Sequence, residues 1–264
     1  MTHEPTIHVR IEEWSTTAPP GRVAWVTIDN ERKANSLGSA LMERFAAEIE
    51  RLGQDDALRA IVVTGAGDKA FVGGADIREM AGLDGAGARA FITRVHCCCD
   101  ALRKAPVPTI ARINGVAFGA GLELAASCDL RVAADHALFG MQEVRLGIPS
   151  VVEAAILPTL IGWGRTRELL LLGEVIDADT AERWGLIERR APGPGLDAAV
   201  DRVLDALLEG GPNAIRLQKA LIGQWDGVSL DEAVARGVDA FERAFAGPEP
   251  ARLLGAFASR RRSE

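Results

Sequence analysis

The sequence predicts an α/β core with largely parallel strands, followed by a helical C-terminal part. Up to about residue 150, short apolar runs that end at turn residues alternate with segments of helical periodicity, which is typical of a parallel sheet. Beyond residue 150, nearly every segment has the spacing of an amphipathic helix. The Pro- and Gly-rich residues 191–195 predict a linker. We therefore expect a core over residues 1–195 and a helical C-terminal region over residues 196–264.

Strands are predicted where β-branched and other apolar residues form short runs bounded by turn residues. The first run ends at Asp29 and Asn30, and the second ends at Gly65. A third run follows Pro108 directly. The predicted strands are residues 23–28, 60–64, 109–113, 130–133 and 138–139.

Helices are predicted where apolar residues recur three or four positions apart. One such amphipathic segment ends before Pro106 and Pro108, which cannot continue a helix. The apolar C-terminal helices are expected to pack on a neighbouring subunit as well as on their own core. The predicted helices are residues 39–51, 91–103, 122–127, 153–161, 165–172, 178–184, 196–208, 214–222, 229–245 and 251–261.

Composition excludes several classes of function. The net charge of -7 gives no general attraction to nucleic acid or to an anionic membrane. No apolar run approaches the ~20 residues of a membrane span. Residues 1–7 have neither the basic nor the apolar region of a signal peptide, so we expect a cytoplasmic protein. Cys97, Cys98, Cys99 and Cys128 lack metal-site spacing and are expected to be small buried hydrophobes, with no metal bound.

Residues 65–70 fit the pattern G-x-G-x-x-G/A after a predicted strand. A dinucleotide site also needs a helix that opens at once and holds the pyrophosphate at its N-terminus. The following residues 71–75 open no helix, so we expect neither a dinucleotide nor any other cofactor.

Two glycine-rich turns each precede a predicted helix. Gly73 and Gly74 lead to a helix that begins near Asp76, a candidate N-cap, and leave the N–H of Ala75 free. Ala120 stands in the same position in the run Gly119-Ala120-Gly121. Two such donors can converge on one oxygen and stabilise negative charge there, as in an oxyanion hole. The alternative is an ordinary glycine turn before a capped helix.

Glu123 and Glu143 stand among apolar neighbours, where a carboxylate is costly to ionise. If both face one pocket, they form a general acid/base pair. The alternative for a lone helical glutamate is a solvated helix face, which the flanking Leu122 and Leu124 make less favourable.

Four segments together resemble the crotonase (enoyl-CoA hydratase/isomerase) superfamily over about residues 8–262. They are Lys33-Ala34-Asn35-Ser36-Leu37, residues 74–80, residues 114–125 and Phe139-Gly140-Met141-Gln142-Glu143. The resemblance implies a spiral of ββα units with a helical trimerisation region, and homotrimers or dimers of trimers. It implies that the amides of Ala75 and Ala120 hold a thioester oxygen. It also implies that an acyl-CoA substrate is contacted by Lys33, Ala34, Ser36, Asp76, Ile77 and Arg78. The basic residues 260–262 are candidates for further phosphate contacts, and the alternative for them is a solvated, frayed terminus.

Both glutamates are present, as in the hydratases that the chain resembles. This implies hydration of a 2-trans-enoyl-CoA to a 3-hydroxyacyl-CoA, in which Glu123 activates water and Glu143 protonates the α carbon. The alternatives are a Δ3,Δ2-enoyl-CoA isomerase or another acyl-CoA reaction, and a non-catalytic or RNA-binding homologue. Ser150 replaces a glycine of the hydratases, and Glu153 adds a third carboxylate. Ser150-x-x-Glu153 predicts a capping box at a helix start, and the alternative is a different catalytic acid.

Overall fold

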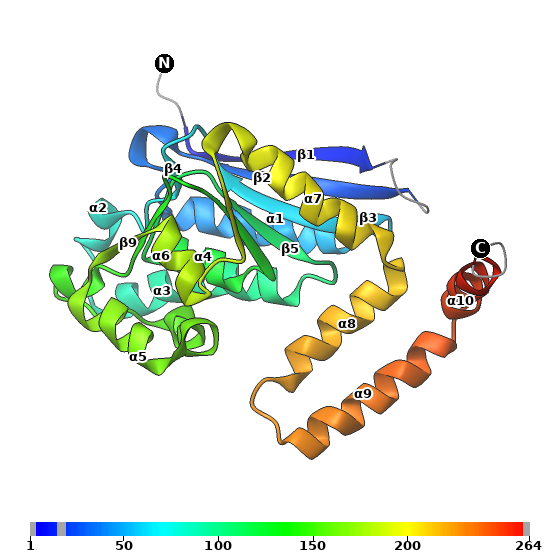
Figure 1. The fold of residues 1–264 in the computed structure, drawn as a ribbon. Helices are drawn as coiled ribbons and strands as arrows, with labels where there is room; N and C mark the ends of the chain where they lie inside the picture. Colours follow the sequence, from blue (N-terminus) through cyan, green and yellow to red (C-terminus); the bar gives the residue numbers. More distant parts are fainter. Residues whose placement is uncertain (1–3, 15–19, 261–264) are drawn as a thin grey trace.

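The fold is organised by a large twisted sheet in which most strands are parallel (Figure 1). The computed structural model describes residues 4–14 and 20–260. Within these residues the sheet has the strand order β1-β2-β3-β5-β7-β10. Only the β1–β2 pairing is antiparallel. The strands are β1 (Thr6–Trp14), β2 (Gly21–Asp29), β3 (Leu58–Gly65), β5 (Thr109–Ile113), β7 (Leu130–Ala134) and β10 (Arg189–Ala191).

A second, smaller sheet is built from short strands that follow strands of the large sheet. It has the order β4-β6-β8-β9, with β9 antiparallel to β8. Each of β3, β5 and β7 is followed by one short strand of this second sheet, and helices or helical turns come next. The repeated ββα unit confirms the predicted spiral. The strands are β4 (Ala70–Val72), β6 (Val116–Phe118), β8 (Leu138–Gly140) and β9 (Val175–Asp177).

Helices cover both faces of the large sheet, which explains why β3 is buried along its whole length. Helix α1 (Ser39–Gly53) and helix α3 (Gly85–Lys104) pack on the face that includes Val26 and Ile61. Helix α7 (Leu196–Glu209) packs on the opposite face. Although α7 begins at the predicted boundary, it therefore belongs by packing to the core.

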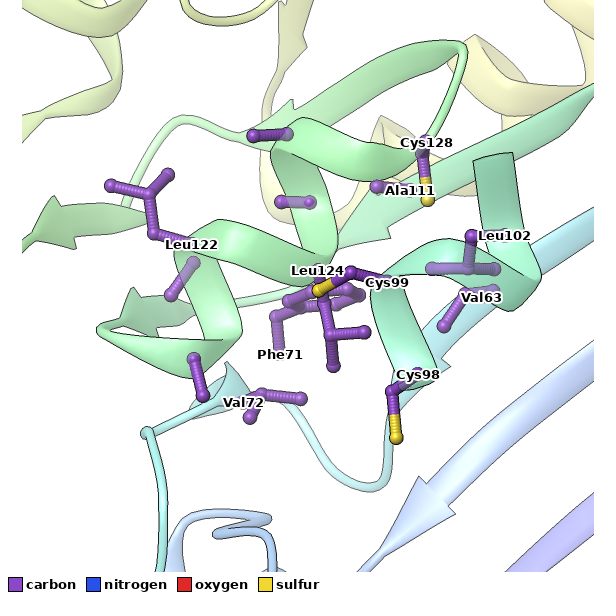
Figure 2. Close-up of a cluster of buried hydrophobic side chains, with 14 of the residues drawn as sticks. Val63, Phe71, Val72, Cys98, Cys99, Leu102, Ala111, Leu122, Leu124 and Cys128 are labelled. Carbon is purple, nitrogen blue, oxygen red and sulfur yellow. The ribbon is translucent and has the colours of Figure 1, made fainter. Parts of the chain in front are cut away.

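Helix α4 (Ala120–Ser127) occupies the centre of the molecule, and each of its residues is buried. Figure 2 shows Leu122 and Leu124 of this helix in one cluster with Phe71 and Val72 of β4 and with Cys99 of α3. The thiols of Cys98, Cys99 and Cys128 are buried as predicted, whereas Cys97 is exposed. Cys97 directly precedes Cys98 on the amphipathic helix α3, and it is exposed because adjacent residues on a helix face different directions.

The segment after β8 differs from the prediction mainly at its start. The expected helix at 153–161 begins as a 3-10 helix η3 (Val152–Ile156) and continues into α5 (Leu157–Leu172), whose second part includes the expected helix at 165–172. The backbone of Gly162, with φ of 75° and ψ of 159°, is not helical, so two helical segments meet there at a kink, between the two predicted helices. The short 3-10 helix η2 (Glu143–Leu146) precedes η3, and α6 (Ala178–Trp184) follows β9 as expected.

The last three helices, α8 (Pro212–Trp225), α9 (Leu230–Phe245) and α10 (Glu249–Arg260), extend away from the sheet (Figure 1). Helix α8 is held to the core by Lys219, whose ammonium donates to the carbonyl oxygens of Leu102 and Val107. Helix α9 exposes apolar side chains along one face. They are Leu230, Val234, Val238, Phe241 and Phe245. The predicted packing of this region on a neighbouring subunit stays a prediction.

Sequence patterns gave no indication of five strands: β1, β4, β6, β9 and β10. Four of them are only three residues long. β1 mixes charged and apolar residues because it lies at an edge of the large sheet.

Within the described ranges, none of the helices combines the length and apolarity needed to cross a membrane.

Gly121 allows α4 to lie directly against β4. A Cβ atom at this position would come within 2.0 Å of the carbonyl oxygen of Val72. We therefore expect Gly121→Ala to lower the free energy of unfolding by ~1–3 kcal/mol, the usual cost of overpacking. Urea denaturation measures this change.

Gly164→Ala is the matched control, because a Cβ there meets no atom within 4 Å. We expect this change in α5 to be neutral or slightly stabilising, since alanine favours the helix. Equal stability of the two variants would contradict the close-approach argument.

Candidate active site

Two backbone segments meet where parallel strands β4 and β6 end. Gly73-Gly74-Ala75 follows β4, and Gly119-Ala120 follows β6. A Cβ atom on Gly74 would lie 3.3 Å from the carbonyl oxygen of Phe118, so the two segments lie side by side. Gly74 has φ of 113° and Gly119 has φ of 50°, which only glycine adopts readily.

The amides of Ala75 and Ala120 are not used in the hydrogen bonds around them. Ala75 forms an isolated bridge with Leu37, but its two bonds use other amides: Leu37 donates to Gly74 and Asp76 donates to Leu37. Ala120 is the first residue of α4, where an amide has no acceptor within its helix. Within residues 4–14 and 20–260, neither amide donates to a backbone acceptor. Both are thus available to a ligand oxygen at the edge of the small sheet.

Glu123 lies in the first turn of α4 and is only 4% exposed. Its Oε1 accepts a hydrogen bond from the backbone N–H of Ala154 at 3.1 Å. Burial raises the pKa of Glu123 from its ordinary value of 4.5 to about 8. The bond from Ala154 opposes this shift, and the negative charges of Glu143 and Glu153 add to it. The side chain is therefore a carboxyl group that exchanges a proton near neutral pH.

Glu143 is half-buried and lies at the start of η2. Its Oε2 accepts a hydrogen bond from the hydroxyl of Ser150 at 2.8 Å. A Cβ atom on Gly119 would lie 2.4 Å from Oε1 of Glu143. The carboxyl group therefore lies over the residue that precedes Ala120. The structure thus brings both glutamates to the end of β6, where the two free amides lie.

Glu153 does not form the predicted capping box. Helix η3 begins after Val151 without a side-chain cap, and the hydroxyl of Ser150 donates to Glu143 instead. The carboxyl group of Glu153 is buried and lies 2.7 Å from Nδ1 of His96 on α3. A non-local partner has replaced the local one. The capping interpretation is therefore wrong.

The residues expected to contact CoA lie in two segments that touch each other. The ammonium of Lys33 donates to Asp76 at 2.8 Å, and the amide of Gly73 donates to the carbonyl of Ala34. The bond from Lys33 holds the pKa of Asp76 below its ordinary value. Asp76 also caps α2 (Ile77–Met80) by accepting from the amide of Arg78, as predicted.

The exposure of these residues suits contact with a ligand. Lys33, Ala34, Ile77 and Arg78 are exposed, and Ser36 is partly exposed. Because the ammonium of Lys33 already pairs with a carboxylate, a phosphate group would have to compete for it. The basic residues 261 and 262 and the side chain of residue 260 lie outside the described residues.

Three features of the site were missed by sequence reasoning. They are the amide of Ala154 on Glu123, the hydroxyl of Ser150 on Glu143, and His96 beside Glu153. Each joins residues from different elements, and no local pattern marks them. The glycine-rich residues 65–70 lead into strand β4 rather than into a helix, as expected. In the part of the chain that the structure describes, no group of His, Cys, Asp or Glu side chains is arranged to hold a metal ion.

The raised pKa of Glu123 makes stability depend on pH. The folded protein disfavours the ionised form, so this group's contribution is favourable below about pH 4.5 and is lost as the pH rises through about 8. Glu123→Gln removes this loss. We expect the variant to exceed the wild type in unfolding free energy by roughly 2–4 kcal/mol at pH 8.5, with a smaller difference at pH 5.

Urea denaturation at a series of pH values measures this difference. Glu168→Gln on the exposed surface of α5 is the control for loss of one negative charge. A difference that stays constant between pH 5 and 8.5 would show that the Glu123 carboxyl group is not perturbed by burial.

Known sequences and structures resemble this chain along nearly its whole length. The sequence pattern described as enoyl-CoA hydratase/isomerase matches residues 19–263. A crotonyl-CoA hydratase of Syntrophomonas wolfei is 34% identical over 92% of this chain and 94% of its own. A short-chain-enoyl-CoA hydratase of Clostridium acetobutylicum is 33% identical over 92% of this chain and 94% of its own.

A solved enoyl-CoA hydratase from Bacillus anthracis is similar with a TM-score of 0.88 and 31% identity, and the match covers 96% of each chain. The fold, the two free amides and the sequence matches therefore agree, and the chain belongs to the enoyl-CoA hydratase/isomerase family.

Proposed function

We propose that this protein hydrates 2-trans-enoyl-CoA thioesters to 3-hydroxyacyl-CoA. The observation that supports this most directly is the placement of two carboxyl groups, Glu123 and Glu143, beside the free amides of Ala75 and Ala120. Relatives named crotonyl-CoA hydratase and short-chain-enoyl-CoA hydratase agree with it. The residues around Lys33 and Asp76 are the proposed contact for the CoA part of the substrate.

In the proposed reaction, Glu123 takes a proton from water and the water oxygen forms a bond to the β carbon. The electrons of the double bond move towards the thioester, whose oxygen gains negative charge. The amides of Ala75 and Ala120 donate to that oxygen, an interaction worth ~2.7–4 kcal/mol for one donor. Glu143 then gives its proton to the α carbon, and the product keeps both the hydroxyl group and the thioester.

The environment of Glu123 suits a general base. A base works best when its pKa lies near the working pH, because it is then both available and strong. A pKa of about 8 meets this condition. The bond from Ala154 holds one carboxyl oxygen and leaves the other for water.

The cytoplasmic location and the homotrimer or dimer of trimers stay predictions.

Isotope labelling tests the reaction type. We expect incubation with crotonyl-CoA in heavy-oxygen water to place one solvent oxygen on the β carbon, measured by mass spectrometry of the product. Conversion of a 3-enoyl-CoA to a 2-enoyl-CoA without solvent oxygen would instead establish the isomerase. Turnover of neither thioester, together with a salt-dependent shift of RNA, would favour the binding homologue.

Removing either carboxyl group tests the acid/base pair. We expect Glu123→Gln and Glu143→Gln each to lower kcat by ~10²–10⁴, the usual contribution of a general acid or base. Loss of absorbance of the conjugated thioester measures the rate. Circular dichroism confirms that the fold is intact. Hydration at the wild-type rate by either variant would remove that glutamate from the mechanism.

The pH profile tests which glutamate is the base. Because kcat/KM reports groups of the free enzyme, ionisation of Glu123 should appear in it directly. We expect kcat/KM to rise with pH and to level off above about 8. A fall of kcat/KM through the same range would assign Glu123 as the acid and Glu143 as the base.

A further inference from the structure

Glu153 is a third buried carboxylate beside the proposed catalytic pair, and the proposed reaction does not use it. It is 3% exposed. Its Oε1 lies 2.7 Å from Nδ1 of His96 and 3.9 Å from a guanidinium nitrogen of Arg103, both on α3. Its Oε2 is buried without a hydrogen-bond partner among the described residues. Burying a carboxyl oxygen without a hydrogen-bond partner costs free energy, which indicates that Glu153 has a function.

The turn that contains Glu153 is strained. Val152, the residue before it, has φ of 41°, which is a genuine outlier for a β-branched residue. Such a conformation is strained and persists only when the surroundings fix it. Two side-chain bonds do so here. Ser150 is bonded to Glu143 on one side of Val152, and Glu153 is bonded to His96 on the other.

The residue after Glu153 is the one that holds Glu123. The amide of Ala154 donates to Oε1 of Glu123, so the direction of that amide depends on the turn that Glu153 anchors. We propose that Glu153 is a positioning residue which, fixed by His96, sets the turn that aims the Ala154 amide at Glu123. This inference rests on the proposed function, in which Glu123 is the base.

The charge of Glu153 acts on Glu123 as well. Its negative charge contributes to the raised pKa of Glu123, after burial and after Glu143. Several other titratable or charged groups face Glu153. They are His96, Cys98, Cys99 and Arg103 of α3, and Glu123 of α4. Arg103 also lies 3.7 Å from Asp226, which follows α8.

Two substitutions separate the two effects of Glu153, its hydrogen bond to His96 and its negative charge near Glu123. Glu153→Ala removes both, and we expect kcat to fall ~10- to 100-fold, the range seen when a partner that orients a metal ligand is lost. KM should change much less, because Glu153 is not proposed to contact the substrate. Glu153→Gln keeps an oxygen for His96, so it should retain most of kcat. Its kcat/KM profile should move to lower pH by about half a unit, since one negative charge is gone.

Substitution of His96 gives a second series. His96→Gln keeps an N–H donor for Glu153, whereas His96→Ala does not. We expect the glutamine variant to retain much more of kcat than the alanine variant. Glu188→Gln is the matched control, because it neutralises a carboxylate that pairs with Arg131, away from the site. Its kcat and its pH profile should equal those of the wild type.

A titration without substrate separates failure of this inference from failure of the proposed function. Carbon NMR of glutamate-labelled protein follows the Glu123 carboxyl signal, assigned by its loss in Glu123→Gln. We expect Glu153→Gln to lower the pKa of that signal even if no enoyl-CoA is turned over. The inference is overturned if Glu153→Ala keeps the kcat of Glu188→Gln, or if the Glu123 signal titrates identically in Glu153→Gln and wild type.

Discussion

The close approach of helix α4 to strand β4 is the constraint on which the site depends. Gly121 lies so near the carbonyl of Val72 that no side chain fits between them. This contact fixes the first turn of α4 and therefore the direction of the Ala120 amide at its start. It also fixes Glu123, which lies two residues after Gly121 in the same helical turn. One packing contact thus positions both an amide donor and a carboxyl group.

Burial has different consequences for the apolar residues of α4 and for Glu123. The apolar residues of the helix join the main cluster with β3, β4 and α3, and their burial stabilises the fold (Figure 2). Glu123 is buried in the same helix, where its charge is disfavoured. The surrounding apolar packing holds the helix firmly in place, so the protein tolerates one carboxyl group in its first turn whose burial is costly. Burial of Leu122 and Leu124 therefore offsets the free-energy cost of burying Glu123, whose raised pKa is useful for acid/base chemistry.

Sequence patterns predicted the parts of the site that follow from local rules. Gly73-Gly74 and Gly119 indicated free amides because positive φ and helix starts have local signatures, and Asp76 was identified as a cap for the same reason. The short strands β4 and β6, which bring these turns together, have no periodicity that a three-residue segment can show. Convergence was therefore inferred from the family resemblance rather than from the strands.

The capping interpretation of Ser150 and Glu153 failed for a physical reason. A local rule assumes that both side chains bond to the nearby backbone. Here Ser150 bonds to Glu143, and Glu153 lies beside His96, 57 positions away along the chain. Each side chain has therefore found its partner in another part of the fold, which a local rule does not consider. Tertiary contacts at a functional site can thus redirect residues that local chemistry assigns to a helix start.

The two glutamates of the pair have unlike surroundings, and this difference is what acid/base chemistry requires. Glu123 lies in the buried helix α4, with a single backbone donor and two carboxylates nearby. Glu143 lies on the half-exposed 3-10 helix η2, where a hydroxyl group donates to it. Burial raises the pKa of Glu123, so this carboxyl group can exchange a proton near neutral pH. Because both carboxyl groups lie beside the free amides, one site offers the two groups that the proposed reaction needs, a proton acceptor for water and a proton donor for carbon.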